Sequence, residues 1–194
     1  FPYTTLFRSD MQVKRFHVLI MPLMTTTASI SASKTPLLAV LLAVAVIAIG
    51  AAFLLRATPA PLVSGQTITG QSVSSKALKG KPYLVNFWAT SCVTCVKEMP
   101  DLVAVHREFE SKGFTTIAVA MSYDRSDYIA TFVKDRHIPF LVIHDKDNVW
   151  TKAYGDVSVT PTTFLVDREG NIMKRYVGEP NFSELRKILA KELG

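Results

Sequence analysis

Apolar and polar residues along the chain follow two different periods, and the change from one to the other marks the expected elements. The run Tyr83–Trp88 is apolar at almost every position, which predicts a strand buried on both faces. After residue 92, apolar side chains recur every three or four positions, as on one face of a helix. Pro100 lies inside this helix and is expected to kink it, and Gly113 is expected to end it.

Strand-like and helix-like segments continue to alternate up to the C-terminus. We expect strands at 114–121, 138–143, 162–166 and 172–177, and helices at 126–137, 149–154 and about 182–193. Residues 66–78 predict a hairpin or short strands, and Asn181 with Glu184 predicts a capped start for the last helix. Strands that alternate with helices and end in a hairpin and a helix predict an α/β fold, with a mixed central sheet flanked by helices.

One apolar segment lies outside this alternation. Residues 37–55 hold no charged or strongly polar side chain and lie between Lys34 and Arg56. At a rise of 1.5 Å per residue, a helix of this length covers about 28 Å, close to the thickness of the hydrocarbon core of a bilayer. A cleaved signal peptide is the main alternative, but its apolar region is usually shorter, roughly 7–15 residues. The pattern predicts one N-terminal transmembrane helix, with the lipid bilayer as its partner.

The charges around this segment predict its orientation. Before residue 37, Lys and Arg outnumber acidic residues four to one, which favours a cytoplasmic N-terminus. The globular part would then face the periplasm or the cell exterior from the inner membrane of a bacterium. The chain divides into an unassigned segment at 1–33, expected to be spurious in part, an anchor at 34–56, a linker at 57–63 and a domain at 64–194.

Net charge narrows the classes of partner. The whole chain carries a formal charge of +6, but residues 1–56 hold five Lys and Arg against one Asp, and residues 57–194 hold 17 against 15 acidic residues. The globular part has no basic stripe, so nucleic-acid binding is excluded.

The segment Asp145–Asn148 lacks the glycine and the final glutamate of a calcium-binding EF-hand loop. We expect no cofactor and no metal site.

The two cysteines of the chain, Cys92 and Cys95, are the candidate reactive groups. Cys92 falls between the predicted strand and helix, where unpaired N–H groups and the helix dipole favour a negative charge. The thiolate is the nucleophile of disulfide exchange, and Cys95 is close enough to form a disulfide with Cys92. Two structural cysteines or half of a zinc site are the alternatives, but zinc normally needs four ligands and the sequence has no second ligand pair. The pattern favours a redox pair.

Two blocks of sequence around these features resemble one family. Residues 85–100 contain the strand, the cysteine pair and the start of the helix, and residues 159–170 contain a Thr-Pro loop and a hairpin. Both blocks resemble the TlpA/ResA family of membrane-anchored thioredoxin-fold disulfide reductases, and the resemblance extends over about residues 62–194. It implies a thioredoxin-like fold and protein-disulfide reductase activity.

The resemblance also implies the roles of the residues in the first block. Cys92 would attack the client disulfide, Cys95 would resolve the mixed disulfide, and Glu98 would tune the cysteines and accept a proton from them. Asn86 stands where cytoplasmic thioredoxins have a buried aspartate, and an amide cannot take up a proton. Glu98 is therefore the leading candidate for proton transfer, as a half-buried carboxylate, and an exposed helix glutamate is the alternative.

The second block is expected to form the substrate side of the site. Pro161 is expected to be cis and to lie beside the cysteine pair, with an ordinary trans proline as the alternative. Thr160 would present its backbone to an extended substrate strand, and Trp88 would also contact the substrate. Ser91 departs from the family, in which many members have tryptophan before the first cysteine, so the surface there is expected to be more polar and less bulky.

The implied partners are the cysteines of client proteins, such as apocytochromes or copper-site proteins, and a membrane thiol-transfer protein of the cytochrome c biogenesis type that supplies electrons. The residues between the cysteines, Val93 and Thr94, do not reveal the reduction potential. The expectation of a reductase rather than an oxidase therefore rests on the resemblance to the family. Two other functions stay open. The cysteines could hold Cu(I) with His144, although copper assembly factors usually have a different cysteine spacing. Cys92 could also act as a thiol peroxidase, although the residues that normally precede a peroxidatic cysteine are missing.

Overall fold

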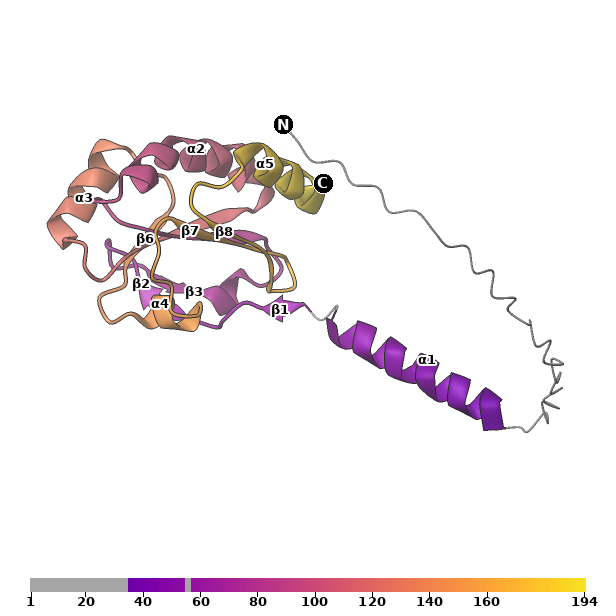
Figure 1. Ribbon diagram of the computed structural model, residues 1–194. Coiled ribbons are helices and arrows are strands. Elements are labelled where there is room, and N and C mark those ends of the chain that lie inside the picture. Colours follow the sequence, from indigo (N-terminus) through magenta and orange to yellow (C-terminus); the bar gives the residue numbers. More distant parts are fainter. Residues whose placement is uncertain (1–34, 55–56) are drawn as a thin grey trace, which may run out of the picture. The chain divides into compact units, whose positions relative to one another are not determined.

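The computed structural model describes residues 35–54 and 57–194, and it divides after Gly50 into two units that are described separately (Figure 1). Helix α1 (Thr35–Leu54) accounts for the described residues before 57. Among the described residues, no helix has the combination of length and apolarity that crossing a membrane requires. The anchor expected at 37–55 is therefore not confirmed, and the segment 1–33 lies outside the described residues.

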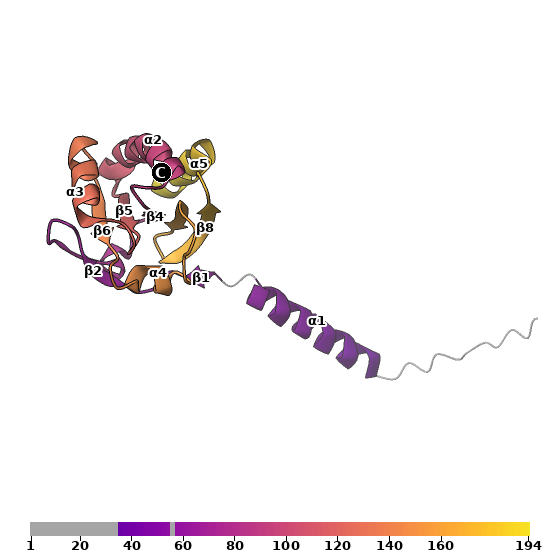
Figure 2. The same cartoon turned by 60° about the vertical axis from the view of Figure 1, so that its left-hand side comes forward.

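The domain is built on a mixed sheet whose strands have the order β1-β8-β7-β4-β5-β6 (Figure 2). Its strands are β1 (Thr58–Pro59), β4 (Tyr83–Trp88), β5 (Thr115–Ala120), β6 (Leu141–His144), β7 (Thr162–Val166) and β8 (Asn171–Val177). Strand β4 pairs in parallel with β5, and β5 with β6, whereas β7 is antiparallel to β4 and β8, and β1 is antiparallel to β8. A second sheet joins β2 (Ser64–Gln66) to β3 (Ser72–Ser74). The predicted mixed sheet is confirmed.

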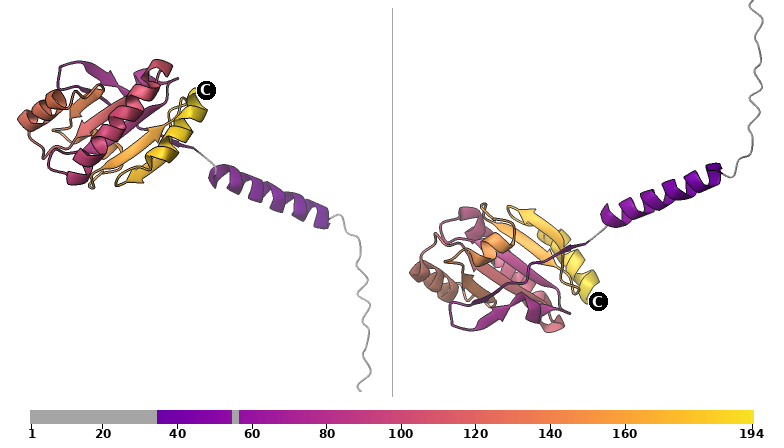
Figure 3. Two further views of the ribbon diagram at one scale, coloured as in Figure 1. Left: turned by 90° about the horizontal axis from the view of Figure 1, so that it is seen from above. Right: turned by 90° about the horizontal axis from the view of Figure 1, so that it is seen from below.

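Helices cover both faces of the larger sheet, as two opposite views show (Figure 3). Helices α2 (Val93–Phe109), α3 (Ser126–Asp135) and α5 (Phe182–Leu193) lie on one face. Helix α4 (Val149–Ala153) lies on the other face together with β2 and β3. Two short 3-10 helices, η1 (Ser75–Leu78) and η2 (Glu110–Lys112), follow β3 and α2. The arrangement agrees with the α/β fold expected from the order of elements.

The central strand β4 contributes to a hydrophobic core on each face of the sheet. Successive side chains of a strand point to opposite faces. Leu84 and Trp88 belong to the core beneath α2 and α5, whereas Val85 and Phe87 belong to the core beneath α4. Burial on both sides explains why β4 is an almost uninterrupted apolar run. Asn86 shares the face of Leu84 and Trp88, so its amide group points towards α2.

The C-terminal end of α2, with its extension η2, and the N-terminal end of α5 lie where the sequence predicts them. Helix α2 is continuous through Pro100, the residue expected to kink it. Its extension η2 stops at Gly113, whose φ of 95° lies in the left-handed region that glycine adopts without strain. The side chain of Asn181 caps α5 by accepting a hydrogen bond from the N–H of Glu184 at 3.0 Å, which confirms the predicted cap.

The expected linker at 57–63 is instead part of the domain. Thr58 and Pro59 pair with β8, and Ala60 and Val63 are buried. A strand of two residues is too short to show a period in the sequence, which is why the pattern did not reveal it.

Two further boundaries differ from the prediction. The strand expected at 138–143 begins at Leu141, because a turn with His137 at a φ of 49° follows α3 and delays it. The segment expected at 66–78 to form a hairpin or short strands contains β3 and the 3-10 helix η1, and the partner strand β2 begins two residues earlier.

Candidate active site

Cys92 and Cys95 lie where β4 leads into α2. They form a disulfide, with 5.2 Å between their Cα atoms, as the sequence predicted. Cys92 is the N-cap residue, and its Sγ accepts a hydrogen bond from the backbone N–H of Cys95 at 3.2 Å. Cys95 is completely buried, whereas Cys92 is partly exposed. A reaction partner from solvent therefore reaches Cys92 first.

The loop in front of Cys92 is held by a buried aspartate in the segment after β5. The carboxylate of Asp124 accepts hydrogen bonds from the N–H and from the hydroxyl of Thr90, each at 2.6 Å. It also accepts a hydrogen bond from the backbone N–H of Arg125 at 2.9 Å. These bonds connect the loops that follow two neighbouring parallel strands, and they fix the chain just before Cys92.

Glu98 lies one helical turn after Cys95 and is completely buried, which corrects the expectation of a half-buried or exposed carboxylate. Its Oε1 accepts a hydrogen bond from Nδ2 of Asn86 at 2.9 Å, and the same nitrogen donates to Oγ1 of Thr163 at 2.9 Å. Within the described part of the chain, Oε2 of Glu98 and Oδ1 of Asn86 have no hydrogen-bond partner. Among the described residues, the Asn86 amide is therefore the hydrogen-bond partner of this carboxyl group, which is otherwise withdrawn from water.

Burial changes the acidity of this carboxyl group. Removal from water disfavours the charged form and raises the pKa of Glu98 from 4.5 to about 7, while the Asn86 N–H opposes the rise and the charge of Glu179 adds to it. An acid with a pKa near neutrality can both accept and return a proton. The position of Glu98 one turn after Cys95 suits it to proton exchange with that thiol.

The peptide bond between Thr160 and Pro161 is cis, as expected. Pro161 is buried and Thr160 is half-buried. Strand β7 begins opposite Phe87, at the end of β4 that leads to the cysteines. The hydroxyl of Tyr123, an exposed residue, lies 3.5 Å from Oγ1 of Thr160. The cis-proline loop and the segment after β5 thus meet at the same end of the sheet as the cysteine pair.

Trp88 does not lie on the substrate-facing surface. It is 1% exposed and packs against Phe132 of α3, with 5.1 Å between the ring centroids. Because its position on β4 directs it into the core, the expectation of a direct substrate contact is wrong for this residue. The surface next to Cys92 is formed instead by Ser91 and by Val93, which is 83% exposed.

The structure does not favour the Cu(I) alternative. His144 ends β6, and its Nδ1 lies 3.1 Å from Oγ of Ser126. Over residues 35–54 and 57–194, no group of three or more His, Cys, Asp or Glu side chains is placed to hold a metal ion.

Comparison with known proteins identifies the family. The family model described as Redoxin matches residues 56–189. The chain belongs to the Redoxin family. It is similar to the thiol-disulfide oxidoreductase ResA of Bacillus thuringiensis subsp. konkukian, with 34% identity over 125 residues that cover 64% of this chain and 70% of the relative. ResA of Bacillus subtilis is 36% identical over 109 residues, which cover 56% of this chain and 60% of the relative. These matches place this Redoxin protein in the TlpA/ResA-like group that its sequence resembles.

Solved structures have the same fold as this Redoxin domain. A thiol:disulfide interchange protein of Chlorobium tepidum matches with a TM-score of 0.66 and 34% identity, over 72% of this chain and 98% of that one. A putative thioredoxin from Neisseria meningitidis matches with a TM-score of 0.65 and 36% identity, over 71% and 91%. The thioredoxin-like α/β fold is therefore confirmed.

Two partners in this Redoxin site were missed by the sequence analysis. Thr163 contacts Asn86 because the two residues are directly opposite each other in the β4–β7 pair, and local pattern does not show which strands pair. Asp124 had a detectable signal. It is a polar residue shortly after a buried parallel strand, and functional groups often follow the carboxyl ends of such strands.

Proposed function

We propose that the protein is a thiol-disulfide oxidoreductase that reduces disulfides in client proteins. The observation that carries this proposal is the Cys92–Cys95 disulfide at the start of α2, with Cys92 accessible and Cys95 buried. Relatives named thiol-disulfide oxidoreductase support it. The asymmetry supports Cys92 as the residue that attacks the client and Cys95 as the residue that acts in the second step.

In the reduced protein, the Cys92 thiolate attacks one sulfur of the client disulfide. A bond forms between Cys92 and the client, and the other client sulfur leaves as a thiolate. Cys95 then gives its proton to Glu98 and attacks the Cys92 sulfur, which re-forms the protein disulfide and releases the second client thiolate. Two electrons pass from the protein to the client. The two client thiolates take up one proton that Cys95 gave to Glu98 and one from solvent, which replaces the proton that Cys92 lost when it ionised.

The surroundings of the cysteines support both steps. The N-terminus of α2 stabilises negative charge on Cys92 through its backbone N–H groups and dipole. Glu98 supplies a buried proton acceptor one helical turn after Cys95. An extended client strand beside Thr160 would use main-chain hydrogen bonds, and Tyr123 borders that position from the opposite loop.

The finer parts of the proposal rest on the resemblance to the TlpA/ResA family. They are the reductive direction, clients such as apocytochromes or copper-site proteins, and a membrane thiol-transfer protein as the electron donor. No cysteine is present beyond the pair, which suits this role because no third thiol competes for exchange.

The proposal places the domain outside the cytoplasm of a bacterium, at the inner membrane, with residues 37–55 as the attachment. This part rests on the apolar sequence of the segment. In cell fractionation, we expect the protein in the membrane pellet, from which detergent releases it and high salt does not. Recovery of the protein in the soluble cytoplasmic fraction would contradict this location.

The experiment that tests the proposed activity measures the reduction potential of the Cys92–Cys95 couple in defined redox buffers. We expect a value well below about −200 mV, near that of reducing thioredoxins. A value near about −120 mV, typical of strong oxidants, would instead make the protein a disulfide donor. Absence of a reversible couple would overturn both directions.

A further inference from the structure

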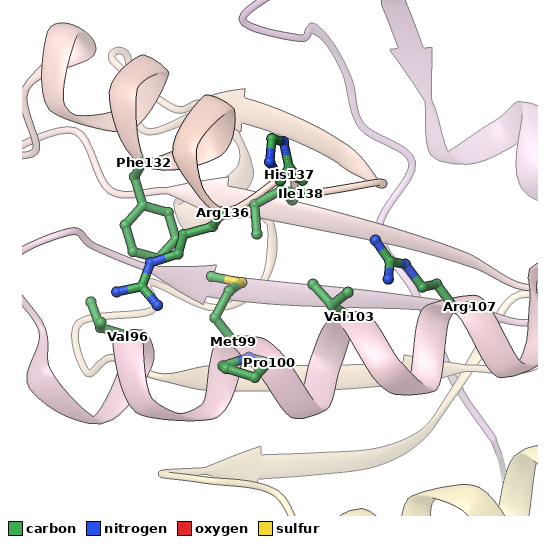
Figure 4. A pocket seen from close by; sticks show the side chains of 9 residues that line it. All are labelled: Val96, Met99, Pro100, Val103, Arg107, Phe132, Arg136, His137 and Ile138. Carbon is green, nitrogen blue, oxygen red and sulfur yellow. The ribbon is translucent and has the colours of Figure 1, made fainter.

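A groove between α2 and α3 begins next to the cysteine pair, and no step of the mechanism above uses it (Figure 4). Its volume is about 370 Å³. The apolar side chains that form it come from α2, α3 and the turn after α3, and we call the space between them the α2–α3 groove. They are Val96, Met99, Pro100, Val103, Phe132 and Ile138.

Basic side chains border the α2–α3 groove. Figure 4 shows the guanidinium group of Arg136 at the end next to Val96, and that of Arg107 towards the opposite end, with His137 between them. No acidic residue lines the groove, and within residues 57–194 neither arginine forms an ion pair. Two guanidinium groups that form no ion pair, above an apolar floor, suit a ligand that carries carboxylates on an apolar body.

The groove leads towards Cys92. A second hollow, which Asp127 and Asp135 also line, shares Phe132 and Arg136 with it and reaches Ser91, the residue just before Cys92. A client whose disulfide has reached Cys92 can therefore extend the chain beside its own cysteine along this surface. This continuity points to a polypeptide as the occupant, since both partners that exchange disulfides at Cys92 in the proposed function, the client and the electron donor, are proteins.

The length of the groove fits a short peptide segment. Val96 and Arg107 are eleven residues apart on one helix, which corresponds to about 16 Å at 1.5 Å per residue. An extended peptide advances about 3.3 Å per residue, so a segment of about five residues spans this distance.

We propose that the α2–α3 groove binds the client segment next to its reactive cysteine and selects segments that carry an apolar side chain between acidic residues. The inference rests on the proposed function and names the class of client. The apolar side chain occupies the space over Met99 and Val103, and the carboxylates face Arg136 and Arg107. A client with lysines at these positions meets two like charges instead.

The test compares matched peptide disulfides as substrates of the full-length reduced protein. Each peptide holds one cysteine as a mixed disulfide with 2-mercaptoethanol, next to a segment with Leu at its centre and Glu, Gln or Lys at both ends. The cysteine is placed before the segment in one set and after it in another. We expect the Glu peptide of the preferred order to be reduced about three to ten times faster than its Lys counterpart at low salt, through KM, with a smaller ratio at high salt.

Variants show whether the arginines cause this preference. In the double variant Arg107→Gln/Arg136→Gln, the ratio between the Glu and Lys peptides should fall below about twofold, because both charges are removed. Lys134→Gln is the matched control, since Lys134 is an exposed cation of α3 that does not line the groove. It should keep the preference of the wild type.

A small neutral disulfide, 2-hydroxyethyl disulfide, separates this inference from the proposed function. Reduction of the small disulfide with equal rates for the Glu and Lys peptides overturns the groove assignment and leaves the proposed function intact. Failure to reduce any of the disulfides overturns both. A wild-type dimer that the double variant converts to a monomer assigns the groove to a second copy of the chain and also overturns the proposal.

Discussion

Glu98 links the stability of the fold to pH. The folded protein keeps the proton on this buried carboxyl group up to about pH 7, whereas the unfolded chain loses it near the ordinary pKa of 4.5. Between these values the unfolded state gains more from ionisation, so the free energy of unfolding falls as pH rises. Below about pH 4.5 the group is neutral in both states, and this loss of stability is absent.

We predict that Glu98→Gln abolishes this pH dependence. From about pH 4.5 to 7, the wild type should lose on the order of 3 kcal/mol of unfolding free energy through Glu98, whereas the variant keeps a neutral side chain that still accepts from Asn86. Urea unfolding of the oxidised protein at several pH values measures the difference. Glu169→Gln, in an exposed turn, is the control and should follow the wild type. Parallel curves for wild type and Glu98→Gln would contradict the prediction.

Asp124 is a second residue whose effect on the site is indirect. Asp124→Asn should cost about 1–3 kcal/mol, because an amide nitrogen cannot accept one of the two hydrogen bonds from Thr90. We also expect slower reduction of a small disulfide, since the loop before Cys92 loses its support. Asp127→Asn is the matched control, an exposed partner of Arg125 whose ion pair contributes little to stability because water screens it. Equal losses in the two variants would show that Asp124 has no special role.

Among the elements, helix α2 has the largest part in the chemistry, because it makes the two cysteines unequal. Its N-terminus holds Cys92 at the surface, and its first turn carries Cys95 into the core. In the reduced protein, iodoacetamide should therefore modify Cys92 many times faster than Cys95, as peptide mass spectrometry can measure. Cys95→Ser should keep the fast reaction and Cys92→Ser should lose it. Fast labelling of Cys92→Ser would mean that the reduced protein exposes both thiols.

Most helices and strands were predictable because each is long enough to show its own pattern of apolar and polar residues. β4 and β5 are buried on both faces and read as apolar runs, and α2 and α5 show helical spacing over three or more turns. β1 was not predictable, because two residues have no period and their pairing depends on β8. The start of β6 was misplaced because the residues between the turn and the strand, 138–140, are apolar and resemble a strand.

The same reasoning applies to the site. Cys92, Cys95 and Glu98 are close in sequence on one helix, so their spacing alone places them together. The bond from Asn86 to Thr163 joins residues 77 positions apart, and strand pairing determines it. Trp88 was misassigned because the resemblance does not indicate which face of β4 each residue occupies.

At the scale of the whole domain, stability depends on residues 57–63, which precede the β2–β3 sheet. A chain that begins at residue 64 should lose on the order of 2–4 kcal/mol of unfolding free energy relative to one that begins at residue 57, because it lacks the β1–β8 pairing and the buried Ala60 and Val63. Urea unfolding compares the two. The chain from residue 57 should match the domain transition of the full protein. Equal stability of both shortened chains would return residues 57–63 to the role of a linker.

The position of β1 also determines at which end of the sheet the chain enters the domain. β1 pairs with the start of β8 beside the β7–β8 turn, at the opposite end of the sheet from the point where β4 leads into the cysteines. The chain therefore enters the domain at one end of the sheet, and Cys92 lies at the opposite end. The attachment before residue 57 that we propose above would therefore leave Cys92 at the free end of the domain, where an electron donor and a client can reach it in turn.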